Sequence, residues 1–404
     1  MKKNNSIKFA SLFIALTILF SSLMITAPVI ASGNSNKANF LVKPYLLAPK
    51  TDGMTISWET DAPVGAKVLY GLNGKTDTEI DVKCERGTPF KDNTEGIYMY
   101  RAELKDLRPD TIYTYKVELA SGITEEGTFK TLSENPKNLK IFTISDTHEF
   151  LTNEDFAKVV LEERPDFILH SGDFIVGTGF QKEQYAECWF GPGEEFLKHI
   201  PVVYAYGNHD NGPYFYDYFL HGQSQAYNSN KNGHNNSFNV GNTHFIMVNS
   251  NPWGFYEMNA KRSGFEVDAE TKEIIDESVE WIEEDLKSEA AKNATWRVLV
   301  LHHPYTDDYT QKNIVDIVEK NNVDLVLSGH SHVYGRNVSV NPDVGAKINY
   351  ITQGAARDYD SKINYGEDDK RILPDYPEML VQGGANYGTL NIGEKELNFK
   401  ACGI

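Results

Sequence analysis

Cysteine is scarce in this chain. Its 404 residues include three cysteines, Cys84, Cys188 and Cys402, and none of them forms a C-x-x-C pair. Three cysteines are too few for a disulfide framework, so at most one pair could bridge, and the sequence does not say which. We therefore do not expect cysteine chemistry to carry the function.

Basic residues are also few relative to acidic ones. There are 39 Lys and Arg against 57 Asp and Glu, which gives a formal net charge of −18. Such a charge repels nucleic acid and anionic membranes over long range, so neither is an expected partner. A phosphate substrate would have to be attracted locally, and divalent cations could supply that attraction.

Long apolar runs are confined to the amino terminus. Lys2, Lys3 and Lys8 precede an almost uncharged stretch that ends in Val29-Ile30-Ala31, the small-residue pattern of a signal-peptidase site. We interpret residues 1–31 as a signal peptide, whose three lysines would leave a mature charge of −18 − 3 = −21. The chain is then secreted or extracellular. The alternative is an uncleaved anchor at the cell surface, because an apolar stretch of about 20 residues can span a bilayer. If the segment is cleaved, we expect no stable membrane insertion.

Two domains are expected, because single cores usually hold roughly 100 to 150 residues. Residues 39–132 contain short β-rich runs separated by turn residues, such as MTISWET and TIYTYKVEL, which predict a small antiparallel β-sandwich. The polar segment 133–138 holds a proline and is interpreted as a linker. From residue 139 to 404, apolar strand-like runs alternate with amphipathic helical stretches, which predicts an α/β domain with buried sheets. The late runs INYITQG and YGTLNIGEKELNFKA fit antiparallel edge strands.

This second domain contains five short motifs rich in Asp, Asn and His, and four of them lie at the ends of predicted strands. They are SDTH (145–148), GD (172–173), GNHD (207–210), HHP (302–304) and GHSH (329–332). Carboxylate, amide and imidazole groups are ligands for divalent metals, and parallel sheets present such groups at the carboxyl ends of their strands. Any one histidine alone would more often be a packed or surface residue, but their joint order predicts a two-metal hydrolytic site.

In this order the motifs resemble those of the calcineurin-like metallophosphoesterase superfamily. The preceding segments PYLLAPKTDGMTISWET, VLYG, LKDLRPDTIYTYKVE and GTFKT are similar to the fibronectin-type-III-like amino-terminal domain of purple acid phosphatases. The resemblance implies a sandwich at 39–132 followed by a four-layer αββα catalytic domain at 139–404 with two mixed sheets. It also implies a metal-dependent phosphoric ester hydrolase.

Carried over residue by residue, the resemblance implies seven metal ligands around two divalent cations. One site would contain Asp146, His148, Asp173 and His332. The other would contain Asp173, Asn208, His302 and His330, so Asp173 would bridge.

Two further residues in GNHD have implied or candidate catalytic roles. His209 matches the family's histidine that lies beside the phosphate without binding metal, where it could protonate a leaving alkoxide. Asp210 either orients His209 or caps the loop, and both roles are common for such a carboxylate.

One position departs from the purple enzymes, which carry a tyrosine three residues after the GD aspartate and lack the histidine of D-x-H. This chain has Val176 there and keeps His148. Without a phenolate ligand at this position, we expect a colourless or weakly coloured enzyme. The expected metals are Mn, Zn or Fe(II), because N/O ligand sets accept several metals.

The leading hypothesis is a secreted binuclear enzyme that hydrolyses small phosphomonoesters by attack of a metal-bound hydroxide. The alternatives are a phosphodiesterase acting on cyclic nucleotides, lipids or polymers, and a cell-surface binding protein whose catalytic domain is degenerate. Near the site, the Asn-rich segment 228–236 is either a solvated loop or a lining of the cleft through His234. The aromatic residues between Tyr204 and Phe219 either pack in the core or wall a pocket.

Overall fold

The computed structural model describes residues 37–86, 97–148, 154–340, 345, 347–354, 380–382 and 385–403. The predicted signal segment 1–31 lies outside these residues. The described residues belong to one compact unit. None of the described helices combines the length and the apolar character needed to cross a membrane. All three cysteines are free thiols.

The predicted antiparallel sandwich is present. One of its layers contains β1 (Phe40–Leu47), β2 (Met54–Thr60), β5 (Glu85–Arg86) and β6 (Tyr98–Leu104), and the other contains β3 (Ala66–Leu72), β4 (Thr78–Val82), β7 (Ile112–Leu119) and β8 (Thr124–Lys130). Trp58 and Tyr100 stack between the layers with ring centroids 5.2 Å apart, and Tyr115 and Phe129 are buried with them. Aromatic rings bury more area per residue than aliphatic side chains, so they contribute strongly to so small a core.

The sandwich continues into the catalytic sheet, which the sequence did not predict. Strand β1 pairs in parallel with β11 (Val202–Tyr204) through Leu47 and Val202, so nine strands run in the order β21-β20-β9-β10-β11-β1-β2-β6-β5. The buried carboxylate of Glu59 on β2 also connects the sandwich to the catalytic region. It accepts a hydrogen bond of 2.7 Å from Tyr218 Oη and pairs with Lys182 at 2.5 Å.

Two mixed sheets form the catalytic region, as predicted. The first uses β9 (Leu139–Ile144), β10 (Phe167–His170), β20 (Asn386–Ile392) and β21 (Leu397–Gly403) with β11. The second has eight strands in the order β12-β13-β14-β15-β16-β18-β17-β19. Its strands are β12 (Asn228–Ser229), β13 (Asn236–Val240), β14 (Thr243–Met247), β15 (Trp296–Val300), β16 (Leu325–Ser328), β17 (Tyr334–Val340), β18 (Lys347–Thr352) and β19 (Leu380–Gln382).

Alternate residues of the second sheet face two different cores. Val298 and Val300 of β15 pack toward the nine-stranded sheet, whereas Leu299 and Leu301 pack toward the helices outside. This period of two is that of a strand buried on both faces. The run INYITQG was predicted as an antiparallel edge strand, but β18 lies inside the sheet and pairs in parallel with β16. The prediction was right for β20 and β21, which close the edge of the first sheet in antiparallel fashion.

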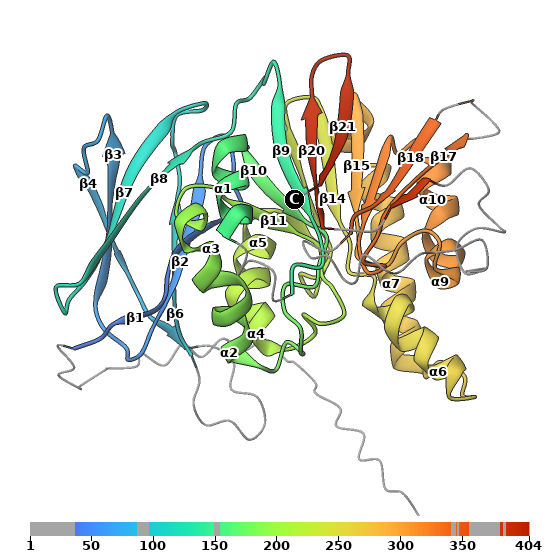
Figure 1. The fold of residues 1–404 in the computed structure, drawn as a ribbon, viewed down its shortest axis with the longest axis horizontal. Coiled ribbons are helices and arrows are strands. Elements are labelled where there is room, and N and C mark those ends of the chain that lie inside the picture. The colour runs from blue at the N-terminus through green and yellow to red at the C-terminus, as the bar shows by residue number, and fades with distance from the viewer. Residues whose placement is uncertain are drawn as a thin grey trace, which may run out of the picture. The chain divides into compact units, whose positions relative to one another are not determined.

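Helices cover the outer faces of both sheets (Figure 1). On the first sheet, α1 (Glu154–Glu163) and α3 (Gly191–Leu197) bury Phe156 and Phe196. On the second, α7 (Ala269–Leu286) and α10 (Asp316–Lys320) bury apolar residues such as Ile282. The remaining helical segments are short: α2 (Lys182–Tyr185), η2 (Ala186–Phe190), α4 (Pro213–Phe215), η3 (Tyr216–Leu220), α5 (His221–Ala226), η4 (Pro252–Glu257), α6 (Met258–Arg262), α8 (Glu289–Asn293), α9 (Asp308–Thr310) and η5 (Gln311–Val315).

Candidate metal centre

The predicted ligands all follow the carboxyl ends of strands. Strands β9, β10 and β11 are parallel neighbours in the first sheet, and β15 and β16 are parallel neighbours in the second. The loops after these five strands carry the five motifs. Because the two sheets pack face to face, the loops meet at one edge, where ligands of α/β proteins usually bind.

The first group of donor atoms is centred on Asp146. Its Oδ1 lies 3.3 Å from Nε2 of His332, and this nitrogen lies 3.2 Å from Nε2 of His148. Asp146 and His148 are buried, and His332 is partly exposed. The ligand atoms of these three residues lie close enough together to hold one metal ion.

The second group is centred on Asp173. Its Oδ2 lies 3.1 Å from Nε2 of His302, and Oδ1 of Asn208 lies 3.1 Å from the same nitrogen. Asp173, His302 and His330 form a compact group of possible metal ligands, and Asp173 also groups with His148 and His209. Asp173 therefore connects the two halves of the site.

Hydrogen bonds to backbone carbonyls fix the protonation of three imidazoles. A carbonyl oxygen only accepts, so Nδ1 must carry the hydrogen in His148, in His209 and in His302, whose acceptors are Ile175, Gly177 and Ser171 at 2.7, 2.7 and 2.8 Å. In each neutral ring the Nε2 lone pair then points toward the site. Lone pairs of nitrogen and oxygen that face one another at about 3 Å repel unless a proton or cation lies between them. The donor set therefore fits divalent cations.

The backbone of the site is unusual. Five of the seven predicted ligands have left-handed φ values between 44° and 70°, a conformation that side chains other than glycine adopt rarely. These ligands are Asp146, His148, Asp173, His330 and His332. The motif glycines allow the close packing, since a Cβ on Gly207 would collide with Asp173 and one on Gly329 would collide with Asp146.

Burial and neighbouring charges shift the pKa values of the residues in the site. Burial alone would lower the pKa of His302, but Asp173 outweighs that effect and raises the pKa to about 9. Burial lowers the pKa of His330 to about 4, and it lowers the pKa of His148 as well. Burial also opposes ionisation of Asp146 and Asp173, yet the surrounding histidines hold both pKa values below the usual range. The two carboxylates therefore stay ionised, and a metal ion bound between them would displace the proton that His302 otherwise holds.

The two candidate catalytic residues of GNHD lie in different surroundings. The imidazole of His209 is about one-third exposed, and its Nε2 lies 3.9 Å from Oδ2 of Asp173. Asp210 is fully buried and accepts hydrogen bonds from three backbone N–H groups, those of Asp173, Phe174 and Gly207, at 2.8, 2.9 and 3.1 Å. These bonds have the form of a loop cap, the second of the two roles considered for Asp210. Burial raises the pKa of Asp210 to about 7, and the Asp173 carboxylate adds to the rise.

His303 contacts the site, which the sequence did not indicate. The centroid of its buried ring lies 4.5 Å from that of His330. Its Nδ1 lies 2.8 Å from Oγ of Ser250. The carbonyls of Ser171, Ile175 and Gly177 were also missed, because every residue has a carbonyl and no side-chain pattern marks the ones that orient a ligand.

Other candidates from the sequence are resolved by packing. The aromatic residues Tyr204, Phe215, Tyr218 and Phe219 are buried in the main core. His170 and His244 are buried and hydrogen-bonded, the latter to Asp285 at 2.8 Å. His234 lines a cavity beside the site rather than a fully solvated loop.

Comparison with known proteins finds two matching domain families. Residues 139–334 match the calcineurin-like phosphoesterase family, and residues 42–131 match the purple acid phosphatase N-terminal domain. The chain combines these two domains. The first match spans all five motifs that build the site, from Asp146 to His332. The chain is accordingly a metal-dependent phosphoric ester hydrolase, as the sequence resemblance implied.

Relatives and solved structures agree with this assignment. The chain is 26% identical over 345 residues to a probable purple acid phosphatase 20 of Arabidopsis thaliana, an alignment that covers 76% of this chain and 71% of the plant protein. The fold is similar to that of purple acid phosphatase PPD1 from yellow lupin, with a TM-score of 0.61 at 16% identity, covering 89% of this chain and 71% of the lupin chain. PhoD has a TM-score of 0.59 at 13% identity, with 90% of both chains covered. At these identities the two structures support the fold alone.

Proposed function

We propose that this chain is a secreted phosphomonoesterase whose centre holds two divalent cations. The observation that supports two cations is the position of Asp173, whose carboxylate belongs to separate donor groups with His302 and His330 and with His148 and His209. Asp146 with His148 and His332 supplies a further group. Mn, Zn and Fe(II) all suit this mixture of imidazole, carboxylate and amide donors.

Cations bound here would polarise the phosphate and supply a nucleophile at neutral pH. The protein's own residues have separate tasks. The Ile175 and Ser171 carbonyls hold His148 and His302 with their lone pairs inward, and the Asp210 carboxylate fixes the backbone of the Asp173 loop. His209 is about one-third exposed and is not among the predicted metal ligands, so it is placed to exchange a proton with a leaving alkoxide.

Preference for monoesters is tested with a matched pair of substrates. The purified protein is reconstituted with Mn, Zn or Fe(II) and assayed on para-nitrophenyl phosphate and bis-para-nitrophenyl phosphate across pH. We expect faster turnover of the monoester, and Asp173→Asn should be inactive while Asp81→Asn, at an exposed position on β4, should behave as the parent. A strong diester preference would identify a phosphodiesterase instead. Inactivity on every ester after reconstitution would favour a degenerate binding protein.

Secretion rests on the amino-terminal sequence alone. Expression of the full chain followed by mass spectrometry of the exported protein should give a product that begins at Ser32, immediately after Ala31. Retention of the segment in a membrane fraction would instead support a surface anchor.

A further inference from the structure

A cavity of about 260 Å³ lies next to the candidate metal centre. Its size is below the roughly 300 to 1,000 Å³ of pockets for drug-sized ligands, so it suits a small group. Most of the residues that line it have polar side chains. The principal ones are Asn211, His234, Asn249, Asn251, Asp268 and Glu270.

The cavity adjoins the site through two loops. Asn211 belongs to the loop after β11 and stands two positions beyond His209. Asn251 belongs to the loop after β14, and its Nδ2 donates to the backbone oxygen of Gly207 at 2.9 Å, directly before the predicted ligand Asn208. Because β14 and β15 are parallel neighbours, the loop after β14 shares an edge with His302. An ester bound at the metal centre could therefore extend its leaving group into this cavity.

Hydrogen bonds orient the polar wall. Asn249 donates from Nδ2 to Nδ1 of His234 at 3.3 Å, so the hydrogen of the neutral imidazole is on Nε2. Burial lowers the pKa of His234 to about 4, which keeps the ring neutral at physiological pH. The Nε2–H of His234 is thus a donor among the residues that line the cavity, and the carboxylates of Asp268 and Glu270 are acceptors, so a hydroxyl group can engage both kinds because it donates and accepts.

The charge of the lining excludes one class of ligand. Asp268 and Glu270 contribute carboxylates, and no lysine or arginine is among the residues that line the cavity. An anionic group placed beside these carboxylates would be repelled without compensation. A neutral hydroxylated group would not be.

We propose that this cavity is the leaving-group subsite of the enzyme and that it selects phosphomonoesters of small, uncharged, hydroxylated alcohols. The proposal rests on the proposed phosphomonoesterase function and adds the class of alcohol to it. His234 and the carboxylates of Asp268 and Glu270 bind the hydroxyl groups, and Glu270 disfavours leaving groups that carry a negative charge.

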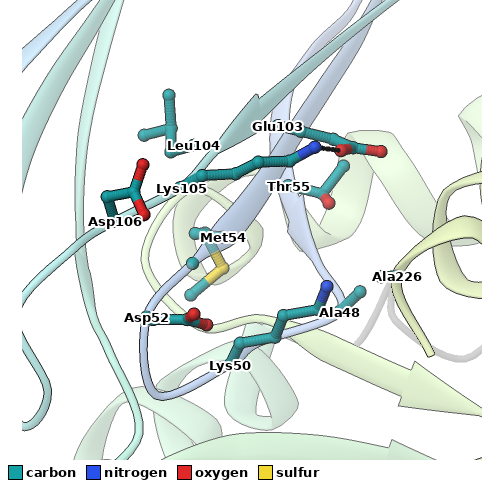
Figure 2. Close-up of a pocket in the computed structure, with 11 residues that line it drawn as sticks. Ala48, Lys50, Asp52, Met54, Thr55, Glu103, Leu104, Lys105, Asp106 and Ala226 are labelled. Carbon is teal, nitrogen blue, oxygen red and sulfur yellow. Dashed lines mark ion pairs between the residues drawn. The ribbon is translucent and has the colours of Figure 1, made fainter.

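A second cavity, in the sandwich, has no comparable features. It measures about 200 Å³ and is lined by the turn between β1 and β2, the start of β2, the end of β6 with the two residues after it, and Ala226 (Figure 2). Its lysine Lys105 pairs with Glu103 at 2.8 Å, and none of its lining residues belongs to the metal centre. It therefore suggests no role in the reaction.

The test compares two esters of the same carbon skeleton, glycerol phosphate and phosphoglycerate, each phosphorylated on a terminal carbon. They differ in whether the leaving group ends in a hydroxymethyl group or a carboxylate. We expect the reconstituted parent to have a kcat/KM about tenfold higher for glycerol phosphate, because the carboxylate meets like charge. Glu270→Lys should reduce or reverse that ratio. Glu277→Lys is the matched control, since it makes the same charge change at an exposed position of the same helix outside the cavity.

A cavity-filling variant gives an independent readout. Thr271→Trp should lower kcat/KM for glycerol phosphate about tenfold, because remote contacts that orient a substrate contribute to turnover, while the inhibition constant of inorganic phosphate stays within about twofold. Equal parent rates on the two esters, or a ratio that Glu270→Lys and Glu277→Lys change equally, would overturn the subsite. A parent inactive on every phosphate ester would instead overturn the proposed function on which the subsite depends.

Discussion

Oδ2 of Asp173 lies 3.1 Å from Nε2 of His302, although the two residues follow strands of different sheets. The contact exists because β10 and β15 end at the same edge of the packed layers. Neither sheet alone contains the complete donor set. Metal binding at this site is consequently coupled to packing of the sheets, and cations that bind only the folded protein should stabilise it.

Asp173→Asn tests the connecting carboxylate. The substitution keeps the shape of the side chain but removes its charge, so the metal content should fall and kcat/KM on para-nitrophenyl phosphate should drop at least about 100-fold. Elemental analysis and steady-state kinetics check both effects, with Asp81→Asn as the exposed control. Unchanged metal content and turnover would refute the shared-ligand role.

His209→Ala separates catalysis from metal binding. We expect turnover on an alkyl phosphate to fall by about 10²- to 10⁴-fold while the metal content stays at the parent level. The substitution should matter less for a nitrophenyl ester, whose leaving group does not need a proton. Because Nε2 of His209 lies within reach of Asp173, loss of a metal ion would show that His209 is a ligand.

Asp210→Asn distinguishes a loop cap from an orienting carboxylate. The replacement puts an amide nitrogen among three backbone donors, so the free energy of unfolding should fall by about 1 to 3 kcal/mol, together with metal affinity. At saturating metal, kcat should remain near the parent value. A lower kcat with unchanged stability and metal affinity would instead support orientation of His209. Chemical denaturation and metal titration give the required values.

Because His170 is buried, we expect the stability of the protein to depend on pH. Gly172 N–H donates to its Nδ1 at 3.1 Å, so protonation there would break a hydrogen bond, and burial lowers the pKa of His170 from 6.5 to about 3. Between these values the unfolded chain binds a proton that the folded chain does not. The contribution of His170 to stability is therefore lost as pH falls through about 6.5, by up to about 1.4 kcal/mol per pH unit.

His170→Gln should remove that part of the slope. Urea unfolding of the metal-free protein at pH 7, 6 and 5 gives the slope for parent and variant. Identical slopes would contradict the assignment of a neutral buried His170.

The absorption spectrum tests the departure at Val176. Visible colour in an iron enzyme of this kind requires a phenolate ligand, and Val176 supplies none. The phenol of Tyr206 near the GNHD loop stays protonated, because burial raises its pKa above the ordinary value of a tyrosine. The isolated protein should lack a strong visible band even where elemental analysis finds iron. A purple preparation would contradict the ligand set proposed from the motifs.

Much of the fold was predictable because its periodicities are strong. The runs before Asp146, Asp173 and His302 became parallel strands, and the sandwich followed from short alternating strands with turn residues between them. The internal position of β18 was not predictable, since a short apolar run looks the same at an edge and in the centre of a sheet. The parallel pairing of β1 with β11 was also missed, because strand partners distant in sequence leave no local pattern.

The sequence by itself determined which groups could bind metal, because the identity and order of the Asp, Asn and His residues are chemical facts of the chain. Only the tertiary structure decided how those groups face each other. It set the inward lone pairs of His148 and His302, the capping bonds of Asp210 and the contact of His303 with His330. These features depend on backbone carbonyls and amides, which every residue possesses and which acquire a role only when packing brings them within hydrogen-bonding distance.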